Sequence, residues 1–174
     1  MKTKNIIITV FCMLLVVCIG SCKTNSITNE TPTGFFVSNS QCKSNLSLTP
    51  TSQSLQSSNI DCLQYQYDGS RILTLKHVNA AFNCCPQEIS ATIDITSNTI
   101  TIIEKEAASL CSCLCLFDLE LRIENLTRGT YHIHVIEPYV NSSDTVMEFN
   151  VSLSTQISDQ FCIERNQYPW GLGN

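Results

Sequence analysis

The sequence predicts an all-β protein folded as an antiparallel β-sandwich of about seven strands. Two observations support this. Apolar and polar residues alternate with a period of two from Ile60 almost to the C-terminus, and short polar turns separate the alternating stretches. No stretch beyond the first 22 residues shows the period of an amphipathic helix. A small β-barrel is the alternative that fits the same pattern.

The first alternating stretches predict two hairpins. Residues 63–67 and 73–77 flank the polar turn at 68–70, which reads Asp-Gly-Ser. Residues 89–95 and 100–102 flank a second turn, which reads Ser-Asn. Short turns of this composition between alternating segments are typical of antiparallel hairpins.

Three further stretches predict single strands with one apolar and one polar face. They are residues 117–123, 131–135 and 147–153, which place Phe117, Tyr131 and Met147 at the start of their apolar stripes. Strands of this length, each with one solvent-exposed face, indicate an immunoglobulin-like sandwich rather than a parallel sheet.

Composition limits the domain count and the partners. The chain has 174 residues, 15 acidic and 10 basic side chains, and a formal charge of -5, which predicts one globular domain. Nucleic-acid binding needs a basic patch that displaces counterions from phosphate, so no nucleic-acid partner is expected.

The N-terminus predicts export. Lys2 and Lys4 precede an apolar run, Ile6 to Ile19, that is shorter than the roughly 20 residues needed to span a bilayer and is typical of a signal peptide. The run ends in Ile-Gly-Ser-Cys, which resembles the bacterial lipobox. That resemblance implies lipidation of Cys22 with acyl chains such as palmitate, and a membrane partner reached through this anchor.

Four regions are expected along the chain. Residues 1–21 form a lipoprotein signal peptide, and residues 22–58, rich in Ser, Thr and Asn, form a tether. Residues 59–162 form the cysteine-rich sandwich, and residues 163–174 form a C-terminal tail.

Eight cysteines remain once Cys12, Cys18 and Cys22 are set aside, and an even number suits disulfides, although sequence leaves 105 pairings open. The cysteines at 111, 113 and 115 share the parity of Phe117, so on one unbroken strand all three are expected to face the core. Alternate residues on one strand lie about 7 Å apart, too far for mutual bonding. We therefore expect a bond between the adjacent pair at positions 84 and 85 and one of the cysteines at 111, 113 and 115. The disulfide candidates are Cys42, Cys62, Cys84, Cys85, Cys111, Cys113, Cys115 and Cys162.

A metal site is the competing interpretation of the same cysteines. Thiolates favour zinc or copper(I), and five of them cluster in sequence with one histidine nearby. The ligands of this alternative would be Cys84, Cys85, Cys111, Cys113, Cys115 and His77. The principal expectation is that the protein has no cofactor.

No catalytic motif is present, so we expect a protein that is not an enzyme. His132 and His134 could chelate a metal together, but their parity places them on a wet strand face. Glu104 and Glu106 could act as paired carboxylates, but they too are expected to be solvated.

The lipobox, the tether and the cysteine-rich domain together resemble small lipoproteins of Bacteroidota. The segments HVNAAFNCCP at 77–86 and CSCLCLFDL at 111–119 carry the likeness, which covers residues 70 to about 140. The resemblance implies no catalytic residue. Asp144-Thr145-Val146 looks like the O-glycosylation motif of these bacteria, with Thr145 as acceptor.

The resemblance also bears on location and function. Surface lipoproteins of the group often carry acidic residues after the anchor, whereas this chain has Lys-Thr-Asn-Ser at 23–26. This favours the periplasmic face of the outer membrane over the cell surface. The expected function is a lipid-anchored, non-enzymatic binding or structural module of the cell envelope, and the alternative is an envelope protein that binds metal through its cysteines.

Overall fold

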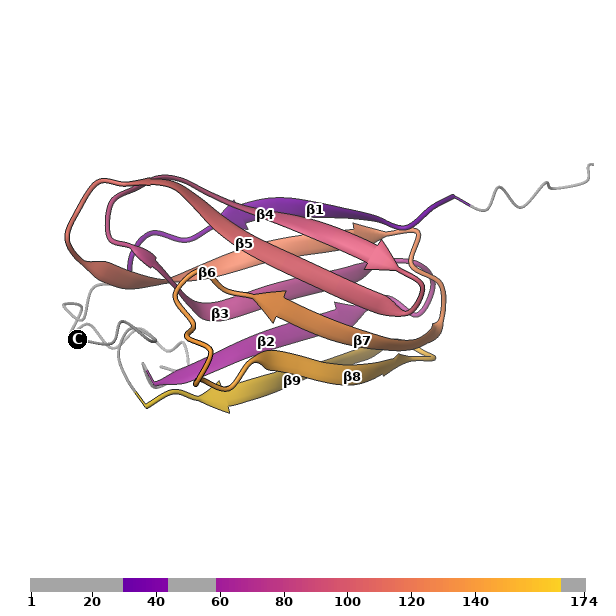
Figure 1. Cartoon of the computed structure of the whole chain (residues 1–174). Coiled ribbons are helices and arrows are strands. Elements are labelled where there is room, and N and C mark those ends of the chain that lie inside the picture. The colour runs from indigo at the N-terminus through magenta and orange to yellow at the C-terminus, as the bar shows by residue number, and fades with distance from the viewer. Residues whose placement is uncertain (1–29, 44–58, 167–174) are drawn as a thin grey trace, which may run out of the picture.

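The computed structural model describes residues 30–43 and 59–166, which form nine strands in two sheets. Figure 1 shows the sheets stacked face to face. The first contains, in spatial order, β1 (Thr33–Asn39), β6 (Leu114–Glu124), β3 (Leu73–Asn83), β2 (Ile60–Tyr67) and β9 (Ile157–Glu164). The second contains β4 (Pro86–Thr96), β5 (Thr99–Ser109), β7 (Gly129–Ile136) and β8 (Met147–Leu153).

The sandwich prediction is confirmed, because the described strands make two separate sheets and no closed barrel. Both predicted hairpins are present, as β2–β3 and as β4–β5. One pairing departs from the antiparallel expectation: β5 and β7 run parallel. Within the described residues no helix is long and apolar enough to cross a bilayer.

Two strands were not predicted, and they move the domain boundaries. β1 lies inside the segment expected to be a tether, yet it pairs with β6 and packs beside β4. β9 runs past the expected end of the sandwich at residue 162, and the next residue, Arg165, is buried. The domain therefore includes residues 33–43 and reaches at least to Arg165, while residues 44–58 of the expected tether lie outside the described residues.

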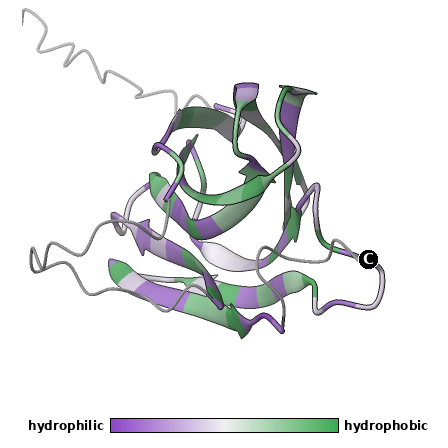
Figure 2. Cartoon of the chain, turned by 90° about the vertical axis from the view of Figure 1, so that its left-hand side faces the viewer, coloured by the Kyte–Doolittle hydropathy of each residue, from purple (hydrophilic) through white to green (hydrophobic). Residues whose placement is uncertain are grey.

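The core follows the predicted alternation, and Figure 2 shows apolar and polar residues succeeding one another along the strands. The largest apolar cluster fills the space between the sheets from residues of β2, β3, β5, β6, β7, β8 and β9, with Tyr67 and Leu73 fully buried. A smaller cluster around Phe82 and Phe117 lies further along β3 and β6. A bulge in β3 at Asn79, whose φ is 71°, separates the two clusters along that strand.

Four disulfides join the eight cysteines. The expected bonds between the 84/85 pair and the 111/113/115 group occur twice. The expectation that positions 111, 113 and 115 all face the core is wrong, because β6 begins only at Leu114 and Cys113 is exposed. The bonds are Cys42–Cys115, Cys62–Cys162, Cys84–Cys113 and Cys85–Cys111.

We expect Gly34→Ala to destabilise the domain by about 1 to 3 kcal/mol through overpacking. A methyl group at this position in β1 would lie 2.6 Å from Cγ2 of Ile93 in β4, far inside van der Waals contact. Gly129→Ala is the matched control, because its methyl would meet Tyr131 at an ordinary 3.4 Å. Urea denaturation measures both, and equal stabilities would show that β1 does not pack against β4.

The disulfides differ in the entropy that they remove from the unfolded chain. Cys85–Cys111 closes nearly the loop that Cys84–Cys113 already closes, whereas Cys62–Cys162 spans 100 residues. With the other bonds intact, the chain-entropy relation gives a loss of about 4 kcal/mol for Cys62→Ala/Cys162→Ala and about 2 kcal/mol for Cys85→Ala/Cys111→Ala. Denaturation without reductant measures both losses, and the opposite ranking would contradict the pairing.

Candidate functional site

Within residues 30–43 and 59–166, five charged or titratable side chains lie buried between the sheets. They come from five separate places in the chain, and each continues the inward-facing stripe of its own strand. Asp61 precedes Leu63 and Tyr65, Glu104 follows Ile102, and Glu137 follows Val135 with the same parity. The five, which we call the buried polar cluster, are Asp61, His77, Glu104, Glu137 and Arg165.

His77 lies at the centre of this cluster with no exposed surface. Its Nδ1 lies 2.6 Å from Glu104 Oε1 and its Nε2 lies 2.6 Å from Asp61 Oδ1, so each ring nitrogen faces a carboxylate. Asp61 and His77 come from β2 and β3 in one sheet, and Glu104 comes from β5 in the other. The imidazole therefore links the two sheets.

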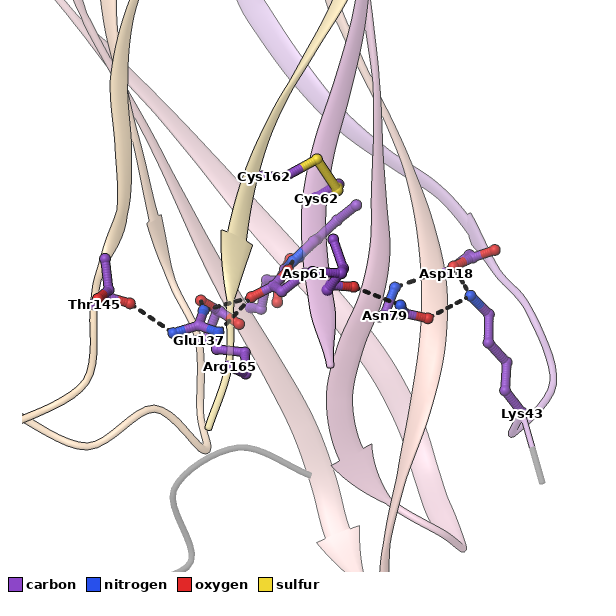
Figure 3. Close-up of polar contacts among 12 residues, drawn as sticks. Lys43, Asp61, Cys62, Asn79, Asp118, Glu137, Thr145, Cys162 and Arg165 are labelled. Atoms are coloured by element: carbon purple, nitrogen blue, oxygen red, sulfur yellow. Dashed lines mark hydrogen bonds and ion pairs between the residues drawn. A yellow bond between two sulfur atoms is a disulfide. The ribbon is translucent and has the colours of Figure 1, made fainter. Parts of the chain in front are cut away.

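Arg165 closes the cluster from the end of β9, as Figure 3 shows. Its Nε donates to Asp61 Oδ2 at 2.8 Å, and its Nη2 donates to the same oxygen and to Glu137 Oε2 at 2.6 Å. Its Nη1 donates to the carbonyl oxygen of Thr145 at 2.6 Å. One guanidinium thus binds two carboxylates and the β7–β8 connection.

Among the described residues, two carboxylate oxygens of the cluster have no hydrogen-bond partner. They are Glu104 Oε2 and Glu137 Oε1, both fully buried. A buried polar atom without a partner costs about 1 to 3 kcal/mol, and more when it is charged. The cluster is therefore short of positive charge or of protons.

Burial and neighbouring charges shift the pKa values of the cluster. Burial, together with the negative charge of Asp61, raises the pKa of Glu137 to about 8. Burial would raise the pKa of Asp61 as well, but His77 and Arg165 hold it below its usual value. Burial would lower the pKa of His77, but Glu104 and Asp61 raise it well above its usual value.

A second polar group lies on the other side of β2 and β3 (Figure 3). Lys43 Nζ donates to Asn79 Oδ1 at 2.9 Å and also contacts Asp118. The Asn79 side chain donates to the carbonyl of Ile60 at 2.6 Å, which anchors the β3 bulge to the start of β2. These side chains are hydrogen-bonded to one another, so this group has the form of a structural brace.

The structure describes most of the site residues that the sequence predicted, beginning with the cysteines. All eight disulfide candidates are bonded to one another, so none of these sulfurs is available as a thiolate ligand. The alternative of a cysteine metal site therefore has no support, and His77 faces carboxylates instead of sulfur. Thr145 is exposed, whereas Cys22 lies outside the described residues.

The remaining predictions concern histidine and carboxylate pairs. His132 and His134 are partly exposed as expected, and His132 Nδ1 contacts Asn150 at 3.2 Å. The expectation that Glu104 is solvated is wrong, because it is 3% exposed. Parity could have revealed this, since Glu104 shares the inward register of Ile100 and Ile102.

Comparisons of the chain with protein-family models, with curated proteins and with solved structures found no match. The site is therefore characterised by its own geometry: a buried histidine between two carboxylates, with a third carboxylate and a guanidinium beside it.

Glu137 makes domain stability depend on pH. Its pKa rises from an ordinary 4.5 to about 8 on folding, so the folded state binds more protons in this window and stability falls as pH rises through it. The raised pKa of His77 acts in the same direction above its ordinary 6.5. The lowered pKa of Asp61 matters only below its ordinary 3.8.

We expect Glu137→Gln to reduce this pH dependence. Where Glu137 is protonated in the folded state and ionised in the unfolded state, the slope that it contributes is about 1.4 kcal/mol per pH unit. Urea denaturation at several pH values between 5 and 8 measures the slope. Glu148→Gln is the control, because that side chain is 56% exposed. Identical slopes in wild type and Glu137→Gln would contradict the shift.

Proposed function

We propose that this chain is an exported, lipid-anchored protein of the cell envelope that acts as a binding or structural module without catalysing a reaction. The observation that carries the proposal is the set of four disulfides in one small domain. Disulfides persist in oxidising compartments and are rare in the cytosol. An exported location fits this chemistry.

The N-terminal sequence supports the same location. A positive start and a short apolar run precede Cys22 in the lipobox-like context Ile-Gly-Ser-Cys. Lipidation at Cys22 would join the domain to a membrane through the segment before β1. Residues 23–26, directly after Cys22, include no acidic side chain, which favours the periplasmic face of the outer membrane over the cell surface.

The domain itself supports a binding or structural role. Disulfides at both edges of the first sheet, Cys42–Cys115 and Cys62–Cys162, resist unfolding where no ATP-dependent chaperone operates. Phe35 and Val37 project from the outer face of β1, 45% and 55% exposed. A rigid scaffold with exposed side chains on its edge strand suits recognition rather than turnover.

The test uses the full chain expressed in a bacterial host with a lipoprotein export pathway. We expect wild type to partition into the detergent phase of Triton X-114 and Cys22→Ser to move to the aqueous phase, because one sulfur carries the diacylglyceryl group. Cys18→Ser is the matched control, since that cysteine would be removed with the signal peptide. Mass spectrometry of the N-terminal peptide completes the test, and an unmodified N-terminus at another residue would refute the anchor.

A further inference from the structure

We propose that Asp61, His77 and Glu137 form a binding site for a divalent transition-metal cation of the zinc type. One donor atom from each residue lies within 4.8 Å of the other two, and all three residues are buried. This donor set contains no cysteine and is distinct from the sulfur cluster that the sequence suggested.

The donor chemistry fits such an ion. Zinc binds imidazole nitrogen and carboxylate oxygen at about 2.0 to 2.2 Å, and three protein ligands with one further position are a common arrangement. His77 Nε2 and Asp61 Oδ1 now lie 2.6 Å apart. Two ligands of one tetrahedral ion lie about 3.4 Å apart at these bond lengths, so these atoms need to separate by less than about 1 Å.

Glu104 supplies the partner that a metal-binding histidine ordinarily has. Its Oε1 lies 2.6 Å from His77 Nδ1 and accepts the proton of that nitrogen. Nε2, which faces Asp61 Oδ1 at 2.6 Å, is then the nitrogen that would give up its proton and bind the ion. A carboxylate on the far ring nitrogen fixes the tautomer and the ring orientation of a histidine ligand.

Arg165 leaves one oxygen of each carboxylate for the ion. It binds Asp61 through Oδ2 and Glu137 through Oε2. Asp61 Oδ1 faces the histidine, and Glu137 Oε1 is buried with no hydrogen-bond partner in the part of the chain that the structure describes. The side chain of Glu137 is only 3% exposed. Because buried polar atoms are normally hydrogen-bonded, its unpartnered oxygen is a second, independent observation that favours a bound cation at this site.

The decisive experiment titrates the full chain, purified without reductant or chelator and with its disulfides intact, with Zn²⁺ by calorimetry and with Co²⁺ by absorption spectroscopy. We expect one ion per chain and a thermal midpoint that rises with metal concentration. Because Glu104 orients His77, Glu104→Gln should weaken binding by about 10- to 100-fold. Glu137→Gln, which removes a ligand, should weaken binding at least as much.

Two control variants separate this site from the exposed histidines. His132→Gln/His134→Gln removes the histidine pair on β7, and Glu148→Gln removes the carboxylate that lies 3.7 Å from His132. Both should bind the ion as wild type does. Circular dichroism checks that each variant is folded, and ¹⁵N NMR of the His77 ring in wild type reports ligation without any substitution.

The proposal is overturned by any of three results. The first is wild-type protein that binds less than one ion per chain at 100-fold metal excess. The second is folded Glu137→Gln that binds as wild type does. The third is binding that disappears in the double histidine variant while the His77 ring resonances stay unchanged.

Discussion

The contact on which the rest of the structure depends is the pair of hydrogen bonds made by the buried His77 ring. Asp61 and His77 belong to one sheet and Glu104 to the other, so these bonds fix how the two sheets face each other. Apolar packing alone is non-directional and tolerates sliding, whereas a buried charged network tolerates very little displacement. Buried ion pairs add little net stability, and their value here is that they define one arrangement of the sheets.

The covalent and ionic parts of the domain support each other. Cys62–Cys162 joins β2 to β9 directly beside the positions from which Asp61 and Arg165 enter the cluster. The Arg165 amide also donates to the Asn59 carbonyl at 2.8 Å, which continues the β2–β9 ladder past the end of β9. Holding these strands together keeps the guanidinium opposite its carboxylates. The cross-link therefore offsets part of the desolvation cost of the charges.

Sequence alternation predicted the sandwich and seven of its nine described strands, β2 to β8, because residues on a half-buried face must alternate. It missed β1 and β9 because neither strand has a continuous buried face: no residue of β1 is buried, and Ile163 is the one buried residue of β9. It placed the 84/85 cysteines against the 111/113/115 group because one hairpin returns the chain to its start. It could not find the buried polar cluster, since Arg165 and Asp61 are 104 residues apart and nothing local marks them as partners.

The connection between β7 and β8 links the buried polar cluster to the surface of the domain. It begins with buried Glu137 and contains exposed Thr145, whose carbonyl accepts from Arg165. Asp144 folds back to accept from the Asn141 amide at 2.9 Å, so this connection is internally braced. Tyr139 and Val140 pack on Ala81 and Leu116 of the opposite sheet. A displacement of this connection would therefore move the Thr145 carbonyl that accepts from Arg165. The position of the exposed connection is in this way coupled to the ion pairs of the buried polar cluster.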